Sequence, residues 1–395
     1  MAKLSLKDLD FKGKKVIVRV DFNVPLDKKT GAVTDDVRIR AAVPTIKYLL
    51  DAGAKKLILM SHLGRPDGKI VDNLRMNAVA KMLADILAEP VEKLDDCVGD
   101  EVKKKIDSTV CRVVLLENLR FHAEEEDGDE NFAKQLASLA DVYVNDAFGT
   151  AHRAHASTAI IAKFLPSCLG FLMEKEVNYL TTALNPRKPY VVILGGAKVS
   201  DKIDVITNLL KKADAILIGG AMAYTFLRAL GFKTGKSLVE EDKLDLAKSI
   251  LADAKKRKVK IVLPVDHVVV DNFDNAASKQ IVEDIPEGFM GVDIGPKSVN
   301  LFKKELEKAK TVLWNGPLGV FENPHYADGT KEIAMFLVEL QDATVIVGGG
   351  DSAKAAKDFC IVNKLSHVST GGGASLEFLE GKELPGIAVI PDKKK

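Results

Sequence analysis

The stretch VIVRVDFNVP, from Val16 to Pro25, has the alternation of apolar and polar residues that is typical of a β-strand. Up to the residue before the proline, apolar side chains alternate with Arg19, Asp21 and Asn23. Because residues two apart point to the same face of a strand, we predict that a guanidinium, a carboxylate and an amide lie in a row. Such a row would orient a bound molecule, although Asp21 and Asn23 also fit the chemistry of a turn before proline.

Eight further apolar runs follow this first strand, and nearly all consist of β-branched or aliphatic residues. They are Leu57–Met60, Val113–Leu116, Val142–Val144, Val191–Leu194, Ile216–Ile218, Ile261–Leu263, Thr311–Trp314 and Thr344–Val347. They lack an exposed alternating face, as is typical of parallel strands covered on both sides, and helical patterns such as AVAKMLADILAE and DVITNLLKKA lie between them. We therefore predict an α/β protein with two Rossmann-like domains, each a parallel β-sheet flanked by helices.

Composition narrows the possible partners. The chain has 395 residues, of which 29% are charged, and its net charge is only +1, so we expect neither a nucleic-acid nor a membrane partner. The four cysteines are scattered without metal-ligand spacing, and no apolar signal segment stands at the N-terminus. These features favour a cytoplasmic protein with reduced thiols.

The predicted boundary between the domains is a helix. We predict an N-terminal domain at 1–170, a connecting helix at 171–184 that ends at Asn185-Pro186, and a C-terminal domain at 185–380. A helix in this place would be a stiffer connector than a flexible linker.

The two halves of the chain differ in the residues that follow their strands, where ligands of open parallel sheets bind. The first half supplies cations and polar groups, namely Arg19, Asp21, Asn23, Arg38, Arg40, His62, Arg65, Arg120, His152, Arg153 and His155. The second half supplies glycine-rich segments, which contain Lys198, Lys202, Asn315, Glu322 and Asp351. Glycine loops before helices suit a nucleotide that carries Mg²⁺, whereas arginines suit a small anion without metal. We therefore expect phosphoryl transfer between the two ligands.

Several of these residues have a structural alternative. Arg40 could lie on a solvated helix face, His62 could bond to backbone, and Lys198 and Lys202 could be solvated helix lysines. Asp351 and Ser352 could cap a helix, and Asn315 and Glu322 could be structural. The HRAH segment, which contains His152 and His155, lacks a third metal ligand with suitable spacing.

The sequence offers two alternative classes of function, an oxidoreductase and a binding protein. A nicotinamide-dependent dehydrogenase is disfavoured because no G-x-G-x-x-G fingerprint occurs, and GFKTGKS is one residue short of a P-loop. A non-catalytic nucleotide-binding protein is compatible with the same sequence features.

Ten motifs, in order and spacing, resemble the phosphoglycerate kinase family. They are RVDFNVP, RIRAAVPTI, SHLGRP, LLENLRF, NDAFGTAHRAHAS, GGAKVSDKI, LPVD, WNGPLGVFE, GGGDSA and STGGGASLEFLEGKELPGI. The resemblance implies an N-terminal domain that binds 3-phosphoglycerate or 1,3-bisphosphoglycerate through Asp21, Asn23, Arg38, His62, Arg65, Arg120 and Arg153. It implies a C-terminal domain that binds MgADP or MgATP through Gly195, Lys198, Lys202, Gly219, Asn315, Glu322, Gly350, Asp351 and Ser352. Asp351 would be the Mg²⁺ ligand, and 381–395 would pack back on the N-terminal domain.

The implied reaction needs no general base, because the attacking group is a carboxylate with an expected pKa of about 3.5 to 4. Catalysis then consists of positioning and charge stabilisation. We expect Arg38, Lys198 and Lys202, with backbone amides of Gly372 and Gly373, to stabilise the transferring group. Arg19 is expected to pair inside the protein. We also expect a monomer that closes about a hinge, with Glu176 and Ser369-Thr370 as candidates.

Overall fold

The computed structural model describes residues 2–393 and forms two compact units. The first comprises Met1–Val177 with Glu383–Lys395, and the second comprises Asn178–Lys382. The division between them therefore falls within helix α6, Phe171–Leu184. Met1, Lys394 and Lys395, at the outer ends of the predicted ranges 1–170 and 381–395, lie outside the described residues.

The first unit is built on a six-stranded parallel sheet with the order β3-β4-β2-β1-β5-β6. Its strands are β1 Lys15–Val20, β2 Lys56–Met60, β3 Val91–Lys93, β4 Val113–Leu115, β5 Val142–Asp146 and β6 Ser167–Leu169. Nearly every residue of the central strands is buried, as continuous apolar runs covered on both faces require.

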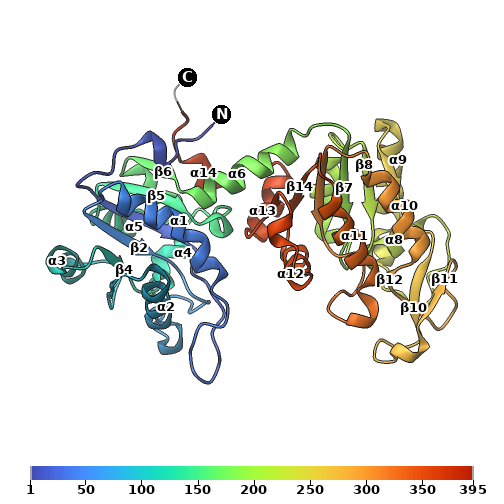
Figure 1. Cartoon of the computed structure of the whole chain (residues 1–395), viewed down its shortest axis with the longest axis horizontal. Helices are drawn as coiled ribbons and strands as arrows, with labels where there is room; N and C mark the ends of the chain where they lie inside the picture. Colours follow the sequence, from blue (N-terminus) through green and yellow to red (C-terminus); the bar gives the residue numbers. More distant parts are fainter. Residues whose placement is uncertain (1, 394–395) are drawn as a thin grey trace. The chain divides into compact units, whose positions relative to one another are not determined.

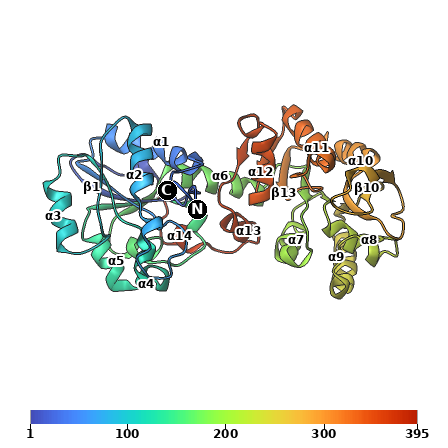
Figure 2. The same ribbon diagram turned by 90° about the horizontal axis from the view of Figure 1, so that it is seen from below.

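Helices cover both faces of this sheet, with α1 and α2 opposite α4 and α5 (Figure 2). The helices of the first unit are α1 Val37–Asp51, α2 Asn77–Leu87, α3 Asp100–Ser108, α4 Ala123–Asp127, α5 Glu130–Ala137 and α14 Pro385–Ala388. Alternate residues of β1, Val16, Val18 and Val20, belong to the core formed with α1 and α2. The intervening Arg19 therefore points to the other face.

The predicted strand from Val16 to Val24 is too long at its C-terminal end. Strand β1 ends at Val20, and residues 21–25 follow it without regular structure. Asp21 accepts a hydrogen bond from the backbone N–H of Asn23 at 3.2 Å, which is the local turn chemistry of aspartate. The alternation of residue types thus continues beyond the pleated strand, and Asp21 and Asn23 lie in the loop at its carboxyl end.

The second unit contains another six-stranded parallel sheet, with the order β15-β14-β13-β7-β8-β9. The strands are β7 Tyr190–Leu194, β8 Ala215–Ile218, β9 Lys260–Val262, β13 Thr311–Asn315, β14 Thr344–Val347 and β15 His367–Val368. Its helices are α7 Ile203–Leu209, α8 Met222–Ala229, α9 Leu244–Arg257, α10 Pro296–Leu306, α11 Asp328–Glu339, α12 Gly350–Asp358 and α13 Gly373–Leu379. Helices α10, α11 and α12 lie on one face of the sheet, opposite α7, α8 and α9 (Figures 1 and 2). The two parallel sheets flanked by helices confirm the predicted fold class.

The second unit also carries an antiparallel sheet that the sequence did not indicate. Its order is β11-β10-β12, with β10 at His267–Val270, β11 at Gln280–Val282 and β12 at Met290–Ile294. Strand β12 matters for the site, because its residues Gly291 and Val292 line the pocket described below.

The chain's C-terminal segment pairs with its N-terminal segment inside the first unit. Lys3 and Asp392 form an antiparallel bridge, and the Leu4 N–H donates to the carbonyl of Pro391 at 2.9 Å. Helix α14 is attached to the loop after β5, where the Gly386 N–H donates to the Ala151 carbonyl at 2.9 Å. Among residues 2–393, no helix is both long and apolar enough to cross a lipid bilayer.

Candidate active site

The first unit gathers its predicted cationic residues at the carboxyl ends of β1, β2, β4 and β5. His62 and Arg65 follow β2, Arg120 follows β4 and Arg153 follows β5, while Arg38 lies in the first turn of α1. Arg40, on the same helix, is exposed and pairs with Asp36 one turn earlier. Arg40 therefore lies on a solvated helix face, the alternative that the sequence left open.

Arg38 is held over the loop after β1 by Asp21. Its NH1 atom lies 3.0 and 2.9 Å from the two carboxylate oxygens of Asp21, and 38% of the Arg38 side chain stays exposed. Asn23 uses its side-chain oxygen to accept from the Gly64 N–H at 2.9 Å, which ties this loop to the loop after β2. Asp21 and Asn23 therefore fix the site's backbone and Arg38, besides any contact that they make with a ligand.

Arg120 and Arg153 share one counterion, which sequence reasoning missed. NH2 of Arg120 lies 3.1 Å, and NH1 of Arg153 lies 3.7 Å, from the same oxygen of Glu126. Arg120 also donates to the Gly64 carbonyl at 2.9 Å. The only signal in the sequence was the acidic run Glu124–Glu126. One carboxylate shared between two guanidiniums leaves donors free for an anionic ligand.

Arg65 is exposed and forms no hydrogen bond or ion pair with any of residues 2–393. It is therefore available to a ligand without first breaking a contact within the protein. Arg19 is 1% exposed and is bonded internally, which confirms the expectation for this residue. Burial, together with the nearby charges of the arginines, lowers the pKa of His62 well below its usual value.

In the second unit, three glycine-rich loops interlock at the carboxyl ends of β7, β8 and β13. The Gly196 N–H donates to the carbonyl of Pro317 at 3.0 Å, and the Gly220 N–H donates to that of Leu318 at 2.8 Å. A Cβ at Gly195 would overlap the Pro317 carbonyl, and one at Gly219 would overlap the Leu318 side chain. These two predicted glycines are thus required by packing of the loops against one another.

The interlocked loops line a concave pocket of about 190 Å³. Of the predicted residues, Glu322 and Asp351 line it. The other lining residues are Gly196, Ala197, Gly220, Ala221, Tyr224, Gly291, Val292, Pro317, Leu318, Gly319 and Val320. Most belong to the motifs GGAKVS, GGAMA and NGPLGVFE, whereas Gly291 and Val292 had no signal in the sequence.

The two predicted lysines of this unit differ in environment. Nζ of Lys202 donates to the backbone carbonyl of Asn315 at 3.3 Å and to the Asn315 side-chain oxygen. Burial lowers the pKa of Lys202 to about 8, against the opposing effect of Asp351 and Asp201. Lys198 is exposed and makes no hydrogen bond or ion pair within the described part of the chain.

The predicted residues of α12 lie at its N-terminus. The helix begins at Gly350 after Gly349, and no side chain caps it, so capping does not explain Asp351 and Ser352. Asp351 is exposed at the rim of the pocket, whereas the buried Ser352 hydroxyl accepts from the Gly316 N–H at 2.6 Å.

Gly372 and Gly373 lie at the start of α13. Gly372 has a φ of +54°, a conformation that disfavours side chains. Together with Gly350, these positions present backbone N–H groups that no helical partner satisfies, the arrangement that binds phosphate.

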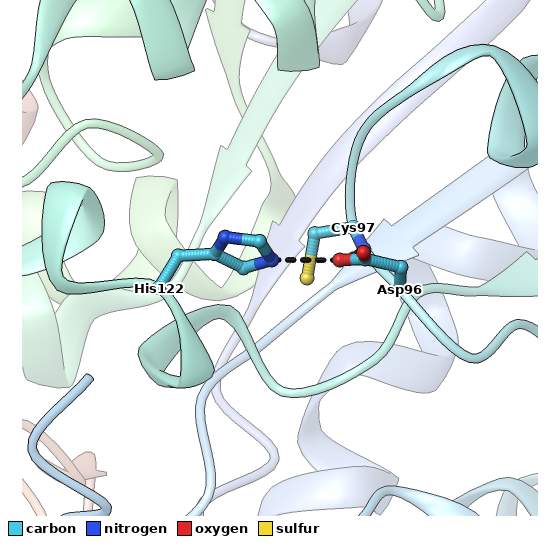
Figure 3. Close-up of side chains that lie close together, drawn as sticks. All are labelled: Asp96, Cys97 and His122. Atoms are coloured by element: carbon cyan, nitrogen blue, oxygen red, sulfur yellow. Dashed lines mark hydrogen bonds and ion pairs between the residues drawn. The ribbon is translucent and has the colours of Figure 1, made fainter. Parts of the chain in front are cut away.

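A separate cluster of Asp96, Cys97 and His122 in the first unit has the residue types of a metal site (Figure 3). Nε2 of His122 lies 2.6 Å from Asp96, and the Cys97 thiol donates to the Glu117 carbonyl at 3.0 Å. Burial and neighbouring carboxylates raise the pKa of Cys97 well above its usual value, which disfavours the metal-binding thiolate. Since these groups satisfy one another and nearby backbone, we assign the cluster a structural role.

Comparison with known proteins decides the family. A family profile for phosphoglycerate kinase matches residues 6–382. The chain belongs to the phosphoglycerate kinase family. A phosphoglycerate kinase of Dictyoglomus turgidum is 57% identical over 394 residues, which cover 99% of this chain and 98% of the relative. The phosphoglycerate kinase of Fervidobacterium nodosum is 56% identical over 402 residues, covering all of both chains. The solved phosphoglycerate kinase of Coxiella burnetii superposes with a TM-score of 0.89 at 39% identity, covering 98% of each chain.

Proposed function

We propose that this chain catalyses the reaction of its family: reversible phosphoryl transfer from 1,3-bisphosphoglycerate to MgADP, which gives 3-phosphoglycerate and MgATP in glycolysis. The observation that carries the proposal is the pair of unlike anion sites in the two units. Guanidinium groups dominate the site of the first unit, and glycine loops form the pocket of the second. A kinase that transfers a phosphoryl group between a small anion and a nucleotide needs a binding site of each kind.

We assign the three-carbon acid to the first unit. Arg65, Arg120, Arg153 and His62 would hold its nonreacting phosphate, and Asp21 and Asn23 would orient its hydroxyl and carboxyl groups. Support comes from the free donors of the exposed Arg65 and from the single Glu126 carboxylate that Arg120 and Arg153 share. Arginine is the side chain best suited to a phosphate that carries no metal.

We assign the nucleotide to the pocket of the second unit, with Gly195, Gly219, Asn315, Glu322, Gly350 and Ser352 as its framework. Asp351 fits Mg²⁺, because proteins hold this ion by one or two carboxylates together with substrate phosphates and water. When bound, the ion would neutralise part of the phosphate charge.

The chemistry needs few protein groups. In the direction of ATP use, the carboxylate of 3-phosphoglycerate is already ionised near pH 7 and attacks without a base. Arg38, Lys198, Lys202 and the amides of Gly372 and Gly373 would stabilise the charge on the transferring group. Reacting atoms must come within about 3–3.5 Å, so ligands bound to two units have to be brought together. We propose Glu176 and Ser369-Thr370 as the hinge, and a cytoplasmic monomer as the working form.

A coupled assay tests the proposed function. Purified protein should form ADP from ATP only when both 3-phosphoglycerate and Mg²⁺ are present. Hydrolysis of ATP at the same rate without 3-phosphoglycerate, or no turnover at all, would contradict it. The second result would revive the alternative of a non-catalytic nucleotide-binding protein.

A further inference from the structure

The guanidinium of Arg19 is bonded at three nitrogens on the face of β1 opposite α1 and α2. Its Nε donates to the hydroxyl of Ser157 at 2.9 Å, and NH1 donates to the Val20 carbonyl. Its NH2 lies 3.1 Å from Nδ1 of His62. With only 1% of Arg19 exposed, these contacts leave it no room to reach a ligand itself.

The direction of these hydrogen bonds follows from the chemistry of the groups. Arginine keeps its charge and can only donate, so Nδ1 of His62 must be the acceptor. An imidazole that accepts at Nδ1 carries its proton on Nε2 and is neutral.

A buried carboxylate holds Arg19 from the other side. The Ser157 hydroxyl, which accepts from Arg19, donates to Glu125 at 2.6 Å, and the Ser157 backbone N–H donates to the same carboxylate at 2.9 Å. Glu125 is fully buried. A chain of hydrogen bonds therefore links Glu125, Ser157, Arg19 and His62. Arg19 donates to His62 on one side and to Ser157 on the other, and Ser157 donates to Glu125.

The charges around His62 also favour its neutral form. Burial and the positive charges of Arg19, Arg120, Arg38 and Arg153 keep the pKa of His62 well below the usual 6.5. Its Nε2 forms no hydrogen bond with residues 2–393, and it is not among the fully buried unpaired atoms, so solvent reaches it.

We propose that Arg19 is a positioning residue that fixes the tautomer of His62, so that Nε2–H is presented as a neutral donor to an anionic oxygen of the three-carbon substrate. Ser157 and Glu125 hold Arg19 in place for this task. The identity of the substrate rests on the proposed function, whereas the tautomer does not.

Nitrogen NMR of the imidazole tests the tautomer directly. Protein labelled with ¹⁵N-histidine is recorded without ligand at about pH 6, and the His62 signals are assigned by their absence from His62→Ala. We expect an unprotonated Nδ1 and a protonated Nε2, even though the pH lies below the usual pKa of 6.5. An Nδ1–H tautomer or a doubly protonated ring would overturn the proposal, whatever the protein's activity.

A double-mutant cycle tests whether Arg19 acts through His62. Arg19→Lys and His62→Ala should each raise the KM for 3-phosphoglycerate about 10-fold and leave the KM for MgATP unchanged, and the double variant should be no worse than the poorer single one. Arg112→Lys is the control and should leave both KM values unchanged, because among residues 2–393 the Arg112 guanidinium donates only to the Leu50 carbonyl. Fully additive effects, or equal changes in both KM values, would overturn the proposal.

Ser157→Ala offers a milder variant should Arg19→Lys fail to fold. It removes the hydroxyl between Glu125 and Arg19 and should raise the same KM about 3-fold, with no further loss in the His62→Ala background. A loss that persists undiminished in that background would contradict the chain of contacts. A wild-type protein without turnover would remove the proposed function and leave the NMR result to decide the tautomer.

Discussion

The two units solve the problem of binding an anion in different ways. In the first, side-chain cations stand at the ends of the strands, and carboxylates such as Asp21 and Glu126 hold them in place. In the second, backbone loops lock together through glycines, and the exposed Asp351 stands at the pocket rim. Since the whole chain has a net charge of only +1, the arginines of the first unit are a local concentration of positive charge at its strand ends. The difference fits a bare anion in one unit and a ligand that brings its own cation in the other.

Replacing Arg38 should have the largest effect on catalysis. Arg38→Ala is expected to reduce kcat about 10³-fold or more, the range lost with an arginine that stabilises phosphoryl transfer, while MgADP affinity stays the same. Steady-state kinetics and calorimetry measure the two quantities. Arg40→Ala is the matched control, since Arg40 lies exposed on the same helix and, within the described part of the chain, its side chain pairs only with Asp36. Near-normal turnover of Arg38→Ala would contradict the assignment.

The second prediction concerns the metal side of the comparison. Asp351→Asn should weaken binding of MgADP about 10- to 100-fold, and should weaken binding of ADP in the presence of a chelator far less. Asp358→Asn, at the other end of the same helix, should change neither affinity. If both forms of the nucleotide lost affinity equally, Asp351 would not be a metal ligand.

Replacing a glycine at the contact between the glycine-rich loops of the second unit should destabilise the fold. Gly195→Ala would place a Cβ against the backbone carbonyl of Pro317 and should destabilise the fold by about 3 kcal/mol. Gly350→Ala meets open space and should change stability by less than about 0.5 kcal/mol. Denaturant unfolding of the two variants compares them, and equal stabilities would show that the loops do not need their close contact.

The smallest effect is expected for substitution of Lys202, which should change the free energy of unfolding and its pH dependence. Its folded pKa of about 8 lies below the usual 10.5, so the unfolded chain binds more protons between these pH values. The cost of burying this charge is therefore complete below pH 8 and disappears as the pH rises to 10.5. Lys202→Met should stabilise the ligand-free protein at pH 7 by about 1–2 kcal/mol.

Unfolding measured across this range provides the check on Lys202. The advantage of the variant should shrink between pH 8 and 10.5, while the exposed Lys198→Met should match the wild type throughout. A variant less stable than the wild type at pH 7, or an advantage that does not change with pH, would contradict the burial of a charged ammonium.

The sequence predicted those strands of the parallel sheets that form long apolar runs. All nine apolar runs found in the sequence form strands of the two parallel sheets, since burial on both faces leaves a continuous apolar signal. Strands β3, β6, β10, β11, β12 and β15 were missed, and four of them, β3, β6, β11 and β15, have only two or three residues, too few for a clear apolar run. The predicted strand from Val16 to Val24 extends beyond the observed end at Val20, because Asp21 and Asn23 continue the alternation although they lie in the following loop.

The site was predictable as a set of residue types but not as a set of contacts. The arginines and glycines stand at strand ends, a place that parallel sheets reserve for ligands. Their partners come from distant sequence: Ser157 lies 138 residues from Arg19, and Asn315 lies 113 residues from Lys202. Only tertiary packing brings such groups together, so the hold of Asp21 on Arg38 and of Arg19 on His62 appears with the structure alone.

A crystal structure with 3-phosphoglycerate and MgADP both bound tests the central claim most directly. The account predicts 3-phosphoglycerate against Arg65, Arg120 and His62 of the first unit, and MgADP in the glycine-lined pocket of the second with its metal at Asp351. Both ligands in one unit, or 3-phosphoglycerate away from the arginines, would contradict it.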